Sequence, residues 1–154
     1  MNDNTLLDSF CEYIFNIKGY SENTVISYKN DILEFKDFIT SKRMAPSLVG
    51  IWDKMICENF VVFLSHQNMS KKTINRKLSS LRSFYDYLLK NNMVQKNFFD
   101  EIQSLKVDKR LPALLKNQEI EDMFKSIDKK TILGFRNYLI LELLYGCGLR
   151  VSEL

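Results

Sequence analysis

The sequence contains few of the residues that build disulfide frameworks or metal sites. Its 154 residues include three cysteines and one histidine. Cys11, Cys57 and Cys147 are far apart and lie among apolar neighbours, so we expect buried free thiols rather than disulfides. Because His66 is the sole histidine, a zinc site is not expected either. These absences argue against a protein held together by disulfides or built around a metal.

Long hydrophobic runs are also absent. No apolar stretch reaches the roughly 18 residues needed to span a bilayer, and the start Met1-Asn2-Asp3-Asn4 lacks the basic residues of a secretory signal. Hydrophobic residues make up 45% of the chain and charged residues 27%, which is typical of a soluble globular protein. We therefore expect a cytoplasmic protein with no membrane partner.

Strand-like alternation is missing, and nearly the whole chain has helical periodicity. Apolar residues recur at three- and four-residue steps, and Gly19, Pro46 and Asn91-Asn92 interrupt the pattern. The spacing predicts an all-α bundle of four to five helices. They are expected over residues 6–17, from a cap at Ser21 to about residue 45, over 52–66 and from a cap at Ser70 to 90, with a short turn of helix near 98–102.

The remainder of the chain is expected to form a basic linker and part of a second domain. Residues 103–112 lose the helical stripe, end in proline and carry Lys106, Lys109 and Arg110. Beyond the linker, we expect a helix capped by Asn117 and a second helix from about Thr131 to Tyr145 that is apolar on nearly every side. Such a helix needs more protein around it than so short a segment supplies. The expected units are 1–102, 103–112 and 113–154, the last one cut short.

Positive charge is concentrated in one short segment. The net charge of the chain is only +3. Residues 1–69 hold six Lys and Arg against nine Asp and Glu, and residues 91–154 hold ten against nine, whereas residues 70–90 hold six against one. This helix-sized segment therefore has a net charge of +5, the electrostatic footprint of a polyanionic partner.

The two faces of this helix differ in composition. Its apolar residues, from Ile74 to Leu88, form the stripe that packs inward, while Ser79 and Ser83 lie opposite among cations. Small hydroxyls between long cations allow a helix to approach a phosphate backbone or enter a major groove. A solvated outer face is the alternative, but such faces usually mix both signs of charge, and acid is nearly absent here until Asp86. The residues expected to bind DNA are Lys71, Lys72, Thr73, Arg76, Lys77 and Ser80.

Two other segments offer groups that bind phosphate. Ser21, Asn23 and Thr24 can present hydroxyl, amide and backbone N–H groups at the positive end of the second helix, although capping explains Ser21 equally well. The glycines of residues 146–148 allow a tight turn that presents Arg150 at a fixed place. The planar fork of an arginine fits two phosphate oxygens at once.

Four segments together resemble one known family. They are Ser21-Glu22-Asn23-Thr24 with Ser27-Tyr28 and Asp31; residues 73–85 (Thr-Ile-Asn-Arg-Lys-Leu-Ser-Ser-Leu-Arg-Ser-Phe-Tyr); Leu111-Pro112; and residues 146–154 (Gly-Cys-Gly-Leu-Arg-Val-Ser-Glu-Leu). In order and spacing the chain is similar to the N-terminal part of Xer-type tyrosine recombinases of the phage integrase family. Asn97-Phe98 departs from the Asn-Pro that is common there.

The resemblance implies a SAM-like core-binding domain and a catalytic domain that clamp duplex DNA, with the second and fourth helices of the first domain near the major groove. It implies that Arg150 is the first catalytic residue, which holds the scissile phosphate while a tyrosine attacks it. It also implies a cofactor-independent enzyme that works as a tetramer and has no small-molecule ligand. The family's lysine, His-x-x-Arg pair, further His or Trp and nucleophilic tyrosine would follow Arg150. We therefore expect this chain to bind DNA without cutting it.

A second hypothesis is a helical interaction module, in which the apolar surface of residues 113–154 docks on a partner or on another copy. A DNA-binding remnant without recombinase activity is a related alternative. The residues leave open which DNA site is recognised, and whether the longer protein resolves chromosome dimers for chromosome partition or integrates a phage or mobile element.

Overall fold

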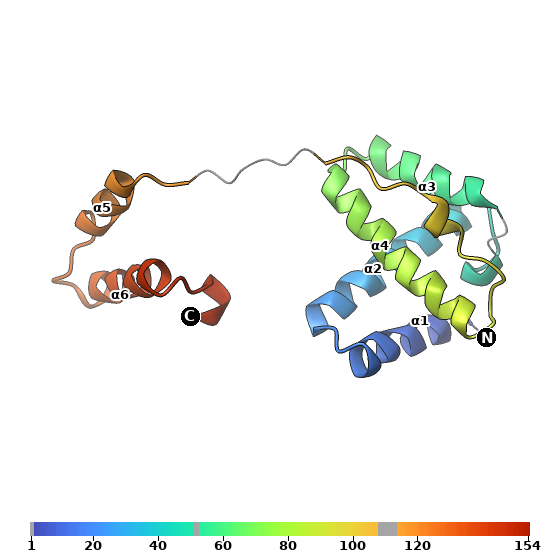
Figure 1. Ribbon diagram of the computed structural model, residues 1–154, viewed down its shortest axis with the longest axis horizontal. Helices are drawn as coiled ribbons and strands as arrows, with labels where there is room; N and C mark the ends of the chain where they lie inside the picture. The colour runs from blue at the N-terminus through green and yellow to red at the C-terminus, as the bar shows by residue number, and fades with distance from the viewer. Residues whose placement is uncertain (1, 51–52, 108–113) are drawn as a thin grey trace. The chain divides into compact units, whose positions relative to one another are not determined.

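The computed structural model describes residues 2–50, 53–107 and 114–154. Within these ranges it contains six α-helices and no β-strand, which confirms the all-α fold class (Figure 1). The chain divides into two compact units, Met1–Asp108 and Lys109–Leu154. Residue 52, where the third helix was expected to begin, and Lys109, Arg110 and Leu111-Pro112, expected in the linker, lie outside the described residues.

Side-chain caps start the helices of the first unit. Ser21 accepts a hydrogen bond from the Thr24 N–H at 3.4 Å, and Ser70 accepts one from the Thr73 N–H at 3.1 Å. Each cap satisfies a backbone donor that has no partner within the helix. The elements of the unit are α1 (Asp3–Glu12), α2 (Glu22–Ser41), α3 (Lys54–His66), α4 (Lys71–Lys90) and the 3₁₀ turns Leu48–Gly50 and Phe98–Glu101.

The first helix changes its winding before it ends. The sequence predicts one helix through residue 17, whereas the structure has α1 followed by a π-helical turn, Tyr13–Ile17. The Lys18 N–H donates to the carbonyl oxygen of Tyr13, five residues back, at 3.2 Å. Gly19 then adopts a φ of +67°, which only glycine reaches at little cost. Tyr20 folds back so that its N–H donates to the Ile14 carbonyl oxygen at 3.0 Å.

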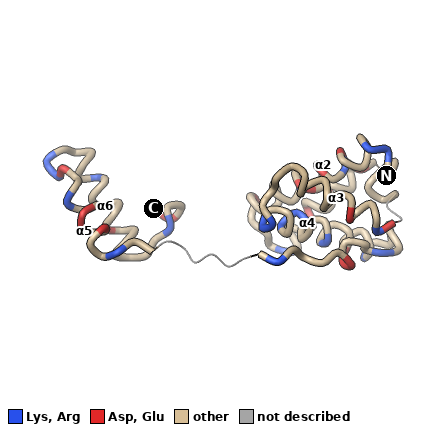
Figure 2. The backbone as a smooth tube through the Cα atoms, turned by 90° about the horizontal axis from the view of Figure 1, so that it is seen from above, with Lys and Arg blue, Asp and Glu red and all other residues tan. Residues whose placement is uncertain are grey.

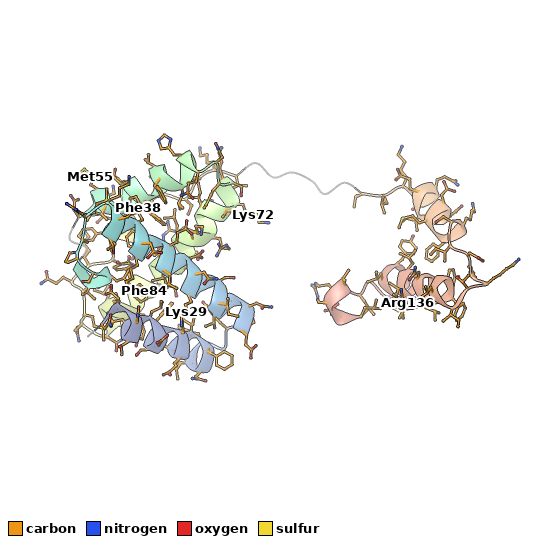
Figure 3. The ribbon with its side chains drawn as sticks, turned by 180° about the vertical axis from the view of Figure 1, so that it is seen from behind. Lys29, Phe38, Met55, Lys72, Phe84 and Arg136 are labelled. Carbon is orange, nitrogen blue, oxygen red and sulfur yellow. The ribbon has the colours of Figure 1, made fainter. Side chains whose placement is uncertain are left out.

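An aromatic core holds the first unit together. The apolar stripe expected on α4, from Ile74 to Leu88, is buried as predicted. The Phe35 ring lies 4.9 Å from the Phe60 ring and 5.1 Å from the Phe99 ring, so α2, α3 and the last 3₁₀ turn meet at one side chain. Phe84 lies within the same bundle (Figure 3). Each such ring contributes about 1.5–3 kcal/mol by burial.

Two polar side chains of α4 hold the segment that leaves the bundle. The Asn75 side chain pairs with the backbone of Leu105, donating to its oxygen and accepting from its N–H at 2.8 Å each. Arg82 donates through Nε to the Phe99 carbonyl oxygen at 3.0 Å and through Nη2 to that of Ile102 at 2.5 Å. Residues 99–105 are therefore fixed along α4.

The second unit is small and largely exposed. It contains α5 (Asn117–Lys125) and α6 (Ile132–Gly146), and Lys116 occupies the cap position expected for Asn117. The Phe124 ring packs against those of Tyr138 and Tyr145 at 5.5 and 6.3 Å. No residue of either helix is buried. This exposure agrees with the prediction that the apolar surface of α6 is larger than its own unit can cover.

The prediction of three buried thiols is only partly correct. All three cysteines are free, but only Cys57 is buried, while Cys11 is half-buried and Cys147 is exposed. Cys147 directly follows α6, where the unit has no layer of protein to cover it.

Candidate nucleic-acid interface

The N-terminus of α4 gathers positive charge and no acid. Lys71 and Lys72 are exposed in its first turn, which contains no Asp or Glu, and neither forms an ion pair with any residue that the structure describes. In Figure 3 the Lys72 side chain extends away from the bundle. Cations are unfavourable at the positive end of a helix dipole. An anion bound there would relieve that repulsion, and backbone N–H groups at a helix start also favour one.

Asp31 of α2 binds three residues of α4 at once. Its side chain is 2% exposed. It accepts two hydrogen bonds from the Arg76 guanidinium, one of them from Nη2 at 2.9 Å, one from Lys77 Nζ at 3.1 Å and one from Ser80 Oγ at 2.9 Å. Lys77 also contacts the Glu34 carboxylate. We call Asp31, Glu34, Arg76, Lys77 and Ser80 the Asp31 cluster.

The Asp31 cluster corrects two of the predicted positions. Ser80 was expected on the outward side of the helix and Lys77 on its flank, but Lys77 is 7% exposed and Ser80 is fully buried. Two carboxylates of α2 draw these side chains into the contact between the helices. The sequence signal was misleading because the acids that neutralise α4 belong to another helix. Arg76 differs, since its side chain remains 45% exposed at the edge of the cluster.

The start of α2 resembles the start of α4 in geometry but not in charge. The Ser21 and Thr24 hydroxyl oxygens lie 2.9 Å apart, as do those of Ser70 and Thr73. Asn23 is exposed beside this cap. The first turn of α2, however, contains Glu22, which already supplies negative charge at the positive helix end. Ser21 therefore caps α2. The N-terminus of α4 is more favourable for binding an anion than the N-terminus of α2.

The outward stripe of α4 combines cations with small hydroxyls. Lys72 and Arg76 are followed on the same side of the helix by Ser79, which is exposed, and Ser83, which is half-buried. Figure 2 shows Lys and Arg along this helix. Small hydroxyl side chains allow close approach of a phosphate backbone and can donate to its oxygens.

Arg150 lies in the second unit, at the end of the glycine turn. Gly148 has a φ of +65°, so the expected tight turn is present. The Arg150 side chain is 81% exposed, and its Nη1 donates to Glu153 Oε1 at 2.9 Å. The guanidinium is thus accessible, with one neighbouring carboxylate.

The described residues contain no group of three or more His, Cys, Asp and Glu side chains placed to bind a metal ion. None of the helices that the structure describes is both long enough and apolar enough to cross a membrane.

The family described as "Phage integrase, N-terminal SAM-like domain" matches residues 7–92, more than half of the chain. The chain belongs to the phage integrase family. The match runs from within α1 to the end of α4 and includes the Asp31 cluster and the outward stripe.

The relatives of the chain confirm its resemblance to Xer-type tyrosine recombinases. It is 38% identical over 153 residues to "Tyrosine recombinase XerC" of Anoxybacillus flavithermus, covering 99% of this chain and 50% of the relative. It is 36% identical over 145 residues to the XerC of Lacticaseibacillus casei, covering 94% and 48%. It is 36% identical over 156 residues to that of Bacillus licheniformis, covering 99% and 50%. The chain therefore spans about half the length of the curated relatives it matches.

Proposed function

We propose that the first unit binds duplex DNA, as the DNA-binding portion of a site-specific tyrosine recombinase. The observation that carries this proposal is the acid-free N-terminus of α4, where Lys71 and Lys72 are exposed and form no ion pair within the described residues. The kinship to proteins called tyrosine recombinases supports DNA as the partner. Lys71 and Lys72 contact backbone phosphates in this proposal through their ammonium groups and their own backbone N–H groups, since the Thr73 N–H already donates to Ser70.

Arg76 has a second role in the proposal. Two of its hydrogen bonds go to Asp31, which holds the guanidinium plane in one orientation. Because the side chain remains 45% exposed, its remaining N–H donors are available to bind a phosphate or the edge of a guanine. A guanidinium held in this way loses less side-chain freedom on binding than a free lysine does. Thr73, Ser21, Asn23 and Thr24 are kept as weaker DNA contacts, whereas Lys77 and Ser80 support the site from inside.

A salt titration tests the proposal. Binding of a labelled duplex would be followed by fluorescence anisotropy from about 50 to 200 mM salt, and each phosphate contact contributes about −0.9 to the log–log slope. The double substitution Lys71→Gln and Lys72→Gln should make the slope shallower by about 1.8. The matched control is Lys42→Gln with Arg43→Gln, which removes the same charge from exposed residues beyond the C-terminal end of α2. Equal losses in both double variants, or no binding by the unaltered chain, would refute the proposal.

The catalytic part of the proposal concerns the longer protein. A tyrosine recombinase cuts and rejoins DNA through a tyrosyl-phosphodiester intermediate, and Arg150 would hold the scissile phosphate and stabilise the charge that develops on it. In a longer protein that contains this chain, Arg150→Ala should abolish the covalent protein–DNA product while duplex binding persists. Retention of the covalent product would remove Arg150 from the catalytic set.

The second unit supports a second candidate function, protein association. Large apolar side chains are exposed on α6, among them Ile132 at 90% and Leu133 at 63%. Leu115, Ile120, Met123, Phe124, Leu141, Leu144 and Tyr145 line an apolar hollow in the same unit. Assembly of recombinase protomers on paired DNA sites would use surfaces of this kind. Sedimentation at several concentrations should show association, and a monomer at every concentration would count against it.

A further inference from the structure

A polar hollow lies beside the C-terminal half of α4. It has a volume of about 310 Å³ and is formed where the π-helical turn and the residues after it face α4. Five of its hydroxyl-bearing or amine-bearing side chains lie outside the outward stripe of α4, namely those of Tyr13, Lys18, Tyr20, Tyr87 and Lys90. The lining residues are Tyr13, Lys18, Tyr20, Ser79, Arg82, Ser83, Asp86, Tyr87 and Lys90.

The unusual winding after α1 builds one wall of this hollow. The π-helical turn and the positive φ of Gly19 turn the chain back, so that Lys18 and Tyr20 both reach the hollow. The Tyr13 ring packs against that of Tyr87 at 5.0 Å and fixes this wall on α4. Isolated π-helical turns cost helix stability and occur frequently at functional sites. Tyr20 directly precedes Ser21, the cap of α2, so the hollow adjoins that helix start as well.

The charges around the hollow favour an anion. Lys18 and Lys90 are exposed, and neither forms an ion pair with a residue in the described part of the chain. The only acid in the lining, Asp86, accepts a hydrogen bond from Asn97 Nδ2 at 2.8 Å. Arg82 adds positive charge while its donors are used by backbone carbonyl oxygens. Two ammonium groups without a carboxylate partner among the described residues therefore line the hollow together with Ser79 and Ser83, and that of Lys18 lies 6.0 Å from the centre of the Tyr13 ring.

The hollow also shares its side of α4 with the proposed DNA contacts. Residues 72, 76, 79, 83 and 90 follow helical spacing, so their side chains point the same way. From Lys72 to Lys90 the helix rises about 27 Å at 1.5 Å per residue, which approaches one turn of duplex DNA, about 34 Å. We propose that this hollow binds a second backbone phosphate of the same duplex, held by Lys18 and Lys90 with the hydroxyls of Ser79 and Ser83. This inference rests on the proposed function and extends its DNA face along the whole of α4.

The test compares two double variants in the salt titration already described. Lys18→Gln with Lys90→Gln should weaken duplex binding roughly tenfold at about 50 mM salt and make the slope shallower by about 0.9, the value for one phosphate. The control is again Lys42→Gln with Arg43→Gln. These residues follow the C-terminus of α2, whereas Tyr20 of the hollow precedes its N-terminus. A loss no larger than that of the control would overturn the second phosphate site. If the unaltered chain binds no duplex, the proposed function fails together with the inference.

A second measurement separates a DNA phosphate from a free anion. Inorganic phosphate would be titrated into the chain while the amide resonances of Ser79 and Ser83 are followed by NMR. Weak shifts at millimolar phosphate, together with the lost duplex contact, support the proposal. The opposite outcome has two parts: inorganic phosphate binds saturably, and the Lys18→Gln, Lys90→Gln variant binds the duplex as well as the control variant does. That result would make the hollow a site for a small anion and would overturn the proposal.

Discussion

Substitution of Asp31 by asparagine should strongly destabilise the first unit. The carboxylate is 2% exposed and accepts hydrogen bonds from Arg76, Lys77 and Ser80. Asparagine keeps the size of the side chain but removes the negative charge, so the buried Lys77 ammonium keeps only the Glu34 carboxylate. Loss of one partner from a buried ion pair typically costs 3–5 kcal/mol. Because Glu34 remains and Arg76 can turn toward water, we expect the lower end, about 3 kcal/mol.

Urea unfolding followed by far-UV circular dichroism measures this loss. With a slope of about 1.5 kcal/mol per molar urea, a loss of about 3 kcal/mol moves the midpoint down by about 2 M. Asp8→Asn is the matched control, because the Asp8 carboxylate pairs with Lys29 Nζ at 2.8 Å but is 63% exposed. Exposed pairs contribute at most about 1 kcal/mol. Equal midpoints for the two variants would refute the idea that Asp31 stabilises the unit through buried charge.

A double-mutant cycle with Lys77→Met separates charge from packing. If the cost of Asp31→Asn comes from an ammonium left without its carboxylate, the substitution should cost about 1–2 kcal/mol less when Lys77 is already methionine. Additive losses, within about 0.5 kcal/mol, would mean that Asp31 acts mainly through Arg76 and Ser80. The same unfolding experiment supplies all four free energies.

Two further predictions concern packing and pH. A Cβ at Gly134 would lie 1.9 Å from the Asp128 carbonyl oxygen, so Gly134→Ala should speed amide hydrogen exchange throughout α6. Gly146→Ala is the control, because a Cβ at Gly146 would have no atom within 4 Å and should leave exchange unchanged. Equal exchange in the two variants would contradict the tight contact at Gly134. Burial, and secondarily the Asp53 carboxylate, raises the pKa of the Cys57 thiol to about 12. The folded unit therefore keeps a proton that the unfolded chain loses, and stability should fall as pH rises from about 9 toward 12. Cys57→Ala should lessen that fall in urea midpoints, and parallel curves for the two proteins would contradict it.

The helices could be predicted from the sequence because burial repeats with the helical period. The stripe of α4, from Ile74 to Leu88, and the capping serines Ser21 and Ser70 lie as expected. The π-helical turn of residues 13–17 could not be predicted in this way, since one extra residue in a turn leaves the apolar pattern almost unchanged. Hydrogen bonds to the carbonyl oxygen five residues back, such as that from the Lys18 N–H to Tyr13, distinguish it from the α-helix that the spacing predicts.

The candidate site was harder to predict, because its charge depends on contacts between distant residues. Helix α4 contains almost no acidic residues of its own. Asp31 lies 45 residues before Arg76 in the sequence but binds it in the fold. Lys77 and Ser80 have the spacing and chemistry of a DNA contact, but their burial and their hydrogen bonds to Asp31 show that they face α2. No sequence pattern indicated that Lys18 belongs to the candidate site, because it is a single cation near a glycine. Its place beside α4 follows from the π-helical turn.

The positive charge left on α4 favours a long polyanion over a small ligand. Of the cations on this helix, Lys77 is buried, Arg82 donates to backbone carbonyl oxygens, and Arg76 shares its charge with Asp31. The exposed ones, Lys71, Lys72 and Lys90, stand at opposite ends of a helix that rises 1.5 Å per residue, about 27 Å apart. A phosphate ester or a nucleotide could reach only one end. A duplex, with phosphates spaced along its length, can neutralise both ends together, which supports the proposal that the +5 charge of residues 70–90 serves to bind DNA.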